Sequence, residues 1–216
     1  MNRAFRDWKF EEVQRTFGLS RLFEYSPLEE LLQASHSPSE RDQLTLRELR
    51  QELLYTIDTL NEEELKVYFI GLLLRLIPFR SGDRRPFLDR PMSFSYGDEQ
   101  EAYGKVDWVL AEGIQDPREP YFFLHEYKKE IDAAGDPLGQ LLIAMVGARR
   151  GYAQRQNGAS FPLYGCYVLG RNWFFVILEE SQYAVSAAFD ATQDDILRIY
   201  SILREINQRT AALVVQ

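Results

Sequence analysis

The sequence has few of the residues that build disulfides and zinc sites. Its 216 residues include a single cysteine, Cys166, and two histidines, His36 and His125. One cysteine cannot form an intramolecular disulfide, so the chain fits a reducing compartment, and a structural zinc site would lack ligands. Cys166 is expected to be a small buried strand residue. His36, in a Ser/Pro-rich turn, is expected to face solvent, and His125 to be packed or hydrogen-bonded.

Long apolar runs are also missing. No stretch approaches the roughly 20 apolar residues that a membrane-spanning helix needs, and no charged-then-apolar signal peptide is recognisable at the N-terminus. We therefore expect a soluble, cytoplasmic protein without a membrane partner. The Gly-x-Ser-x-Gly motif of nucleophile-elbow hydrolases and a glycine-rich phosphate-binding loop are absent, so neither class of enzyme is indicated.

Positive charge is the smaller share of the charged residues. The chain has 25 lysines and arginines against 33 aspartates and glutamates, which gives a formal net charge of -8. An autonomous, high-affinity nucleic-acid binder normally has a basic surface, so this composition argues against one, although it allows local basic patches. A solvated loop and a helix end are the simpler explanation for the arginines at 80–90 and 149–155, and phosphate contacts are the alternative.

Apolar residues are abundant and regularly spaced. Hydrophobic residues make up 45% of the chain and aromatic residues 13%, which is enough for a sizeable core. Residues 1–60 are predicted to be helical, with Ser-Pro-x-Glu helix starts at 26–29 and 37–40. A strong helix is predicted from 61 to about 77. Its expected buried stripe consists of Leu65, Phe69, Leu72, Leu73 and Leu76.

The rest of the chain alternates between strand and helix patterns. We predict a strand or hairpin at 92–111, a strand at 122–128, a helix at 138–152, a three-stranded meander at 163–189 and a closing helix from 194 to about 208. This order of elements predicts an α/β fold with a mixed sheet flanked by helices. The length fits one domain with an appended segment.

One strand-like run ends in an informative pair of charges. Tyr121-Phe-Phe-Leu-His-Glu-Tyr-Lys-Lys129 begins with apolar residues and ends in Glu126 and Lys128. Because strand side chains alternate between faces, Glu126 and Lys128 are expected to share a face with the apolar Leu124. Burying a charge is costly unless it is paired or binds a metal, so a buried strand that ends in charges usually needs them.

A second strand upstream adds a carboxylate. Tyr103-Gly-Lys-Val-Asp-Trp-Val-Leu-Ala111 reads as a strand and contains Asp107. Mg²⁺ typically binds one or two carboxylates, with waters and substrate phosphates as its other ligands, and it lowers the pKa of bound water. Asp107 and Glu126 could hold such an ion with the backbone carbonyl of Tyr127, while Lys128 orients the attacking water. A surface salt bridge at a sheet end is the alternative explanation.

These residues resemble the catalytic motif of the PD-(D/E)XK nuclease superfamily. Gly104-Lys-Val-Asp107 looks like its Asp-bearing strand, and Glu126-Tyr-Lys128 looks like its (D/E)XK strand. Gln140 is similar to the Gln of the following helix in the exonuclease-type branch. The chain is also similar to a group of bacterial proteins that share the Gly-Lys-Val-Asp-Trp, His-Glu-Tyr-Lys-Lys and Asp-Pro-Leu-Gly-Gln-Leu-Leu segments. The name-giving Pro-Asp is absent, since Val106 precedes Asp107.

The resemblance implies a fold and a site. The implied fold is restriction-endonuclease-like, with the core order α-β-β-β-α-β in a nuclease-like domain at 61–216 and an N-terminal helical extension at 1–60. The implied cofactor is Mg²⁺ or Mn²⁺, held by Asp107, Glu126 and a glutamate of the helix that opens the core. The implied catalytic residues are Asp107, Glu126, Lys128 and Gln140.

The helix glutamate has three candidates in Asn61-Glu-Glu-Glu64. At about 100° per residue, Glu62 falls near the buried stripe of the helix and is the preferred metal ligand. Glu64 lies three residues after Asn61 and is better explained as its capping-box partner. Glu63 is expected to point elsewhere.

The resemblance therefore implies a metal-dependent nuclease that hydrolyses phosphodiester bonds, with nucleic acid, foremost DNA, as its partner. Two alternatives stay open. The fold could serve as a catalytically inactive binding or assembly module, which the acidic net charge favours. It could also be an accessory subunit of a restriction or defence system that acts with a partner subunit, or a homo-oligomer.

Overall fold

The structure is a computed structural model that describes residues 2–97, 99–128, 135–155 and 161–213. At residues 119, 125–128 and 152–155 it describes the backbone only. Its helices are η1 (Phe5–Asp7, a 3-10 turn), α1 (Phe10–Phe17), α2 (Ser26–Leu32), α3 (Glu40–Thr56), α4 (Glu62–Leu65), η2 (Lys66–Ile70, a π-helical turn), α5 (Gly71–Arg75), α6 (Pro137–Arg155) and α7 (Asp195–Leu213). None of these described helices is both long and apolar enough to cross a membrane.

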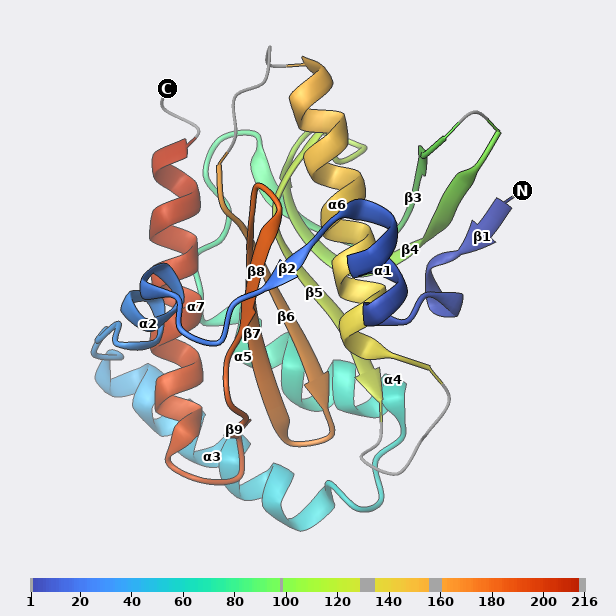
Figure 1. The fold of residues 1–216 in the computed structure, drawn as a ribbon. Helices are drawn as coiled ribbons and strands as arrows, with labels where there is room; N and C mark the ends of the chain where they lie inside the picture. Colours follow the sequence, from blue (N-terminus) through green and yellow to red (C-terminus); the bar gives the residue numbers. More distant parts are fainter. Residues whose placement is uncertain (1, 98, 129–134, 156–160, 214–216) are drawn as a thin grey trace.

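Nine strands of the described chain form one sheet (Figure 1). Its main path has the order β1-β4-β5-β6-β7-β8-β2, with β3 paired to β4 and β9 paired to β7. The strands are β1 (Asn2–Ala4), β2 (Ser20–Arg21), β3 (Arg84–Ser95), β4 (Glu101–Glu112), β5 (Glu119–Lys128), β6 (Leu163–Leu169), β7 (Asn172–Glu179), β8 (Gln182–Val185) and β9 (Phe189–Asp190).

The sheet combines antiparallel and parallel pairs. β3, β4 and β5 are antiparallel neighbours, whereas β5 and β6 are parallel and α6 makes the crossover between them. From α4 to β6 the chain therefore follows the predicted order of one helix, three strands, a helix and a strand. The predicted α/β class, with a mixed sheet flanked by helices, is confirmed.

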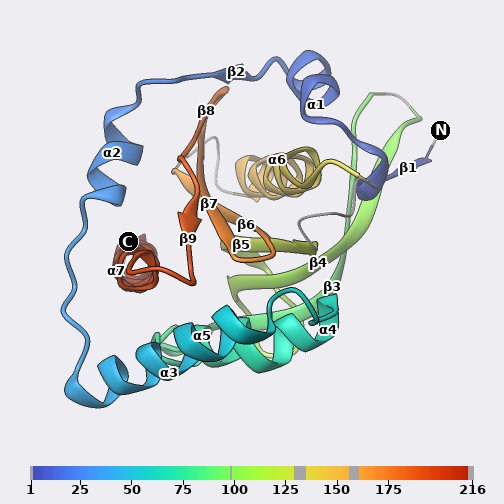
Figure 2. The same ribbon diagram turned by 90° about the horizontal axis from the view of Figure 1, so that it is seen from below.

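Helices lie on both faces of the sheet (Figure 2). An apolar layer fills the space under the helices on each face. On one face, α2, α3, α5 and α7 pack over Phe122 and Leu124 of β5. On the other face, α1 and α6 pack over Phe123. Because helices cover both faces of the sheet at β5, its side chains are buried on both faces, and this explains the continuous apolar run in the strand.

The first 60 residues contribute strands as well as helices. They contain α1, α2 and α3, but β1 pairs with β4 and β2 pairs with β8, both in parallel. In Figure 2 this segment runs around the outside of the molecule from the β4 side to the α7 side. The prediction of a purely helical extension is therefore wrong. The sequence did not indicate β1 and β2, because strands of two and three residues are too short to show alternation.

The helix predicted from 61 to 77 contains the π-helical turn η2. Leu65, Phe69 and Leu73 are buried as predicted, but Leu72 is 48% exposed and Leu74 is buried in its place. A π turn holds one residue more than an α turn, so it shifts the phase of the buried stripe. A period of 3.6 residues cannot anticipate that shift.

Candidate functional site

Strands β4 and β5 separate next to Asp107. Among the described residues, their pairing ends at Trp108 with Leu124. Beyond this pair β4 continues beside β3, and β5 continues beside β6 as far as Lys128. The backbone of Asp107 is therefore one residue past the fork on β4, and that of Glu126 is two residues past it on β5.

The side chains of His125, Glu126 and Lys128 lie outside the described residues. Their backbone belongs to β5, where the register with β6 shifts between His125 and Tyr127. Such a shift interrupts the regular alternation of side chains along a strand. The shared face of Glu126 and Lys128, which we predicted from strict alternation, stays a prediction.

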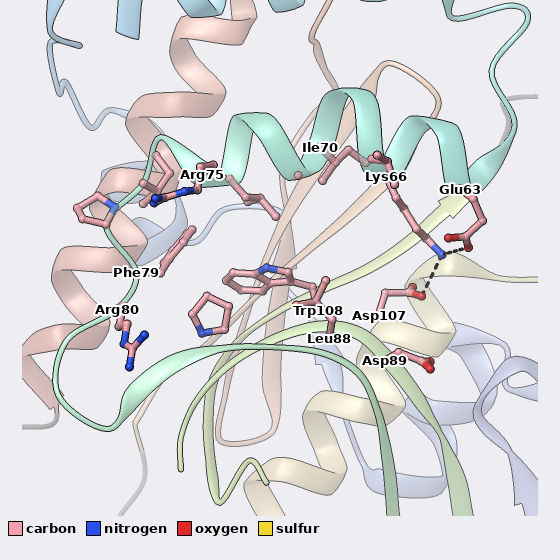
Figure 3. Close-up of a pocket in the computed structure, with 16 residues that line it drawn as sticks. Glu63, Lys66, Ile70, Arg75, Phe79, Arg80, Leu88, Asp89, Asp107 and Trp108 are labelled. Carbon is pink, nitrogen blue, oxygen red and sulfur yellow. Dashed lines mark hydrogen bonds and ion pairs between the residues drawn. The ribbon is translucent and has the colours of Figure 1, made fainter. Parts of the chain in front are cut away.

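Asp107 lies in a cavity of about 880 Å³ between the α4–α5 helix and the β3–β4 hairpin (Figure 3). Lys66 Nζ lies 3.4 Å from Asp107 Oδ1, 2.7 Å from Glu62 Oε1 and 3.1 Å from Glu63 Oε1. Burial alone would lower the pKa of Lys66, but the carboxylates of Glu62, Asp107 and Glu63 outweigh it and raise this pKa. The ammonium thus stays charged among three carboxylates.

A local distortion of the hairpin accompanies the orientation of Asp107. Asp107 and Trp108 both line the cavity, although neighbouring residues of a regular strand point to opposite faces. The pairs on either side, Leu88 with Trp108 and Arg90 with Val106, are formed, whereas Asp89 and Asp107 are not paired. Asp89 has a φ of 48°, in the left-handed region. The irregular backbone therefore lies directly beside the carboxylate.

The three candidate glutamates have distinct partners. The capping box is confirmed, since Asn61 N donates to Glu64 Oε2 at 2.7 Å and Glu64 N donates to Asn61 Oδ1 at 2.9 Å. Glu62 and Glu63 both bind Lys66, because residues three and four apart on a helix are neighbours. Our expectation that Glu63 points elsewhere is wrong, as it lines the Asp107 cavity.

Gln140 lies near the start of α6 and lines a different cavity. This second cavity, of about 850 Å³, is also lined by Phe5, Tyr103 and Lys105. Gln140 is 7% exposed. It is not among the described residues that line the Asp107 cavity. The structure therefore brings Asp107 and Glu62 together through Lys66, but leaves Gln140 apart from them.

Other residues of the Asp-Pro-Leu-Gly-Gln segment have structural partners. Asp136 Oδ1 accepts a hydrogen bond from Gly139 N at 2.9 Å and thereby caps α6. Asp136 Oδ2 accepts one from Phe10 N at 2.7 Å, which ties α1 to α6. A Cβ on Gly139 would lie 2.4 Å from the Trp8 carbonyl oxygen, so glycine is needed for this close approach. These contacts account for Asp136 and Gly139 without a catalytic role.

The described residues do not by themselves form a metal centre. No group of three His, Cys, Asp or Glu side chains among them could hold an ion, and Glu126 lies outside this set. The carboxylate of Asp107 is nevertheless a hard oxygen donor that suits Mg²⁺, which typically takes one or two carboxylates. Glu62 contacts the ammonium of Lys66 rather than Asp107 itself.

Lys66 is the site residue that sequence reasoning missed. Its position after Glu62 and Glu63 gives the i,i+4 and i,i+3 spacing of helical ion pairs, so that part was readable from the sequence. Its contact with Asp107 joins residues 41 positions apart and had no local signal.

Two other sequence expectations have clear outcomes. Cys166 is fully buried in β6 as predicted, and burial raises the pKa of its thiol well above the ordinary value. His36 does not face solvent freely. Its Nε2 lies 2.8 Å from Glu205 Oε2, and its side chain is 25% exposed.

No model of a known protein family matches this chain, and no curated protein matches it. A function for the protein is therefore proposed from the geometry around Asp107 and from the resemblance of its motifs.

Proposed function

We propose that the protein is a metal-dependent nuclease of the PD-(D/E)XK type that hydrolyses phosphodiester bonds in DNA. The observation that carries this proposal is the fork between β4 and β5, with Asp107 one residue past it and facing a cavity. Glu126 and Lys128 follow on the other arm of the fork. Diverging strands leave room for a phosphate between the backbone positions of Asp107 and Glu126. The crossover helix between β5 and β6 supports a restriction-endonuclease-like fold.

Asp107 and Glu126 are the residues that would hold Mg²⁺ or Mn²⁺, which supplies Lewis-acid stabilisation and a more acidic water when bound. Lys128 orients the attacking water. Lys66 fixes the carboxylate of Asp107, and Glu62 and Glu63 in turn fix Lys66. We therefore assign Glu62 a positioning role rather than the metal-ligand role that the sequence suggested. Any supporting contribution of Gln140 would come from the second cavity, which Phe5, Tyr103 and Lys105 also line.

The test is cleavage of DNA by the purified protein with Mg²⁺ or Mn²⁺. We expect Glu126→Ala and Lys128→Ala to abolish cleavage without loss of the circular dichroism spectrum. Glu52→Ala, which changes an exposed carboxylate on α3, is the matched control and should cleave normally. Cleavage that persists in both site variants would contradict the assignment.

A binding or assembly module is the second candidate function. The net charge of -8 favours it, as does the ammonium of Lys66, which already pairs with the carboxylate of Asp107. Calorimetry that detects no divalent-metal binding, together with no cleavage of any nucleic acid, would select this module. Cleavage only after co-purification with a second protein would instead identify an accessory subunit.

A further inference from the structure

The cavity that contains Asp107 has two chemically different ends (Figure 3). At one end the carboxylates of Asp107 and Glu63 surround Lys66. At the other end lie the guanidinium groups of Arg75 and Arg80. Arg75 follows Lys66 by nine positions on the helix, so these two residues are roughly 13 Å apart along the helix axis at about 1.5 Å per residue.

The arginine end is suited to an anion. Arg75 and Arg80 are exposed, and neither pairs with a carboxylate among the described residues. Positive charge in the last turn of α5 is favourable for Arg75, but this does not explain Arg80, which follows the helix. Two exposed guanidinium groups at one end of a concave surface, without a carboxylate partner among the described residues, supply the positive charge and hydrogen-bond donors that a phosphate binds.

The walls between the two ends are apolar. Phe79 and Trp108 are buried in the floor, with ring centroids 5.0 Å apart in an edge-on arrangement. Val67 and Leu88, from the helix and from β3, are 62% and 66% exposed and also line the cavity. Large apolar side chains left exposed on a cavity lined by polar groups at its ends mark a ligand site rather than a core defect.

We propose that this cavity holds an unpaired base of the substrate strand, with a phosphate of the same strand on Arg75 and Arg80. The inference rests on the proposed nuclease function and names its substrate as single-stranded nucleic acid. A base has apolar faces, and it can enter such a cavity only when it is outside a duplex stack. The cavity of about 880 Å³ is within the range of small-ligand sites. The scissile phosphate then lies at the Asp107 end.

The overall charge of the protein fits this substrate better than it fits a long duplex. Duplex binders cover many phosphates with a broad basic surface, whereas this chain carries a net charge of -8. A single strand can bind through a few cations and apolar contacts with its bases. Arg75, Arg80 and the apolar walls supply both.

Measurements of binding in the absence of divalent cations test this inference separately from the metal-dependent cleavage of nucleic acid. Fluorescence anisotropy would compare a short labelled DNA strand, the matching duplex, an RNA strand and a DNA strand that carries abasic sites. We expect the intact strand to bind about tenfold more tightly than the duplex and the abasic strand. The affinity for the RNA strand, compared with that for the intact DNA strand, shows which single-stranded nucleic acid the protein prefers.

Substitutions of cavity residues distinguish the contribution of the phosphate contact to affinity from that of the base contact. The double variant Arg75→Gln with Arg80→Gln should weaken the intact and the abasic strand alike, by about tenfold. Leu88→Ser should weaken only the intact strand and so reduce the difference between the two. Arg41→Gln and Leu54→Ser change exposed residues of α3 outside the cavity and are the matched controls. They should change neither affinity.

The outcomes are distinguishable from those of the nuclease test. Equal affinity for strand and duplex, or cavity variants that bind like the controls, would overturn this inference even if the protein cleaves DNA. Affinity for a mononucleotide equal to that for the strand would also overturn it. Selective strand binding by a protein that cleaves nothing would uphold this inference and refute the nuclease.

Discussion

At the scale of single residues, the ammonium of Lys66 is the cation that the carboxylates of Glu62, Glu63 and Asp107 share. Its side chain is 21% exposed and that of Asp107 is 26% exposed, so solvent screens their contact only in part. Without the ammonium, Glu62, Glu63 and Asp107 would lose the cation that they share. Like charges held together in a partly buried site oppose folding and shift their own protonation.

Lys66→Met tests this role, because methionine keeps an unbranched apolar chain and removes the charge. We expect the free energy of unfolding to fall by about 1 kcal/mol at neutral pH, since the contacts are partly exposed. If the protein is a nuclease, we also expect its cleavage rate to fall about tenfold, because Asp107 loses its positioning contact. Chemical denaturation and initial rates measure the two effects, and Arg41→Met is the matched control.

The pH dependence of the same variant has a defined sign. The carboxylates raise the pKa of Lys66 above its ordinary value of 10.5 in the folded protein. A group with a raised folded pKa contributes its full stabilisation below the unfolded pKa and loses it as the pH rises through the folded pKa. The stability difference between wild type and variant should therefore be constant from pH 7 to about 10 and shrink above that. A difference that grows at high pH would contradict this assignment.

Residue-level prediction from the sequence succeeded where the cause is local. The capping box of Asn61 and Glu64 is set by a spacing of three residues, and the structure confirms it. Asp107 was singled out because it is a carboxylate within an apolar strand-like run, and the structure places it in β4 at a cavity. Its contact with Lys66 and the left-handed backbone of Asp89 arise from the pairing of distant segments, so no local pattern indicated them.

At the scale of elements, the π turn η2 decides which residues of the α4–α5 helix face the core. The sequence predicted Leu72 in the buried stripe, whereas the structure buries Leu74 to 6% exposure and leaves Leu72 exposed. Helix length and position were predictable from the apolar period. The phase after η2 was not, because it depends on how the helix packs across β4 and β5.

Leu74 and Leu72 form a matched pair for testing this phase. Leu74→Ala removes buried methyl groups and should lower the free energy of unfolding by about 3 kcal/mol. Leu72→Ala removes an exposed side chain from the same helix and should cost less than about 0.5 kcal/mol. Urea denaturation of both variants measures the difference. A larger loss for Leu72→Ala would mean that the helix keeps a regular α-helical phase.

At the scale of the whole molecule, the first 60 residues are part of the sheet and of both apolar layers. Trp8 and Val13 are buried in the layer over α6, and Leu31 and Leu46 are buried in the layer beside α7. Of the helices in this segment, α2 and α3 were predictable from start signals in the sequence. Its attachment was not, because β1 and β2 pair in parallel with strands far along the chain.

This arrangement makes a prediction about residues 61–216 expressed alone. Without the first 60 residues, apolar surface on both faces of the sheet would be exposed, and the capping carboxylate of Asp136 would lose Phe10 N. We expect the shortened chain to lack a cooperative thermal transition by circular dichroism and to aggregate, because the lost burial exceeds the marginal stability of a domain. Asp136→Ala in the full chain keeps the segment and should cost only about 1 kcal/mol, the usual value of a helix cap. A shortened chain that melts cooperatively close to the full-length temperature would instead show that the segment is a separable extension.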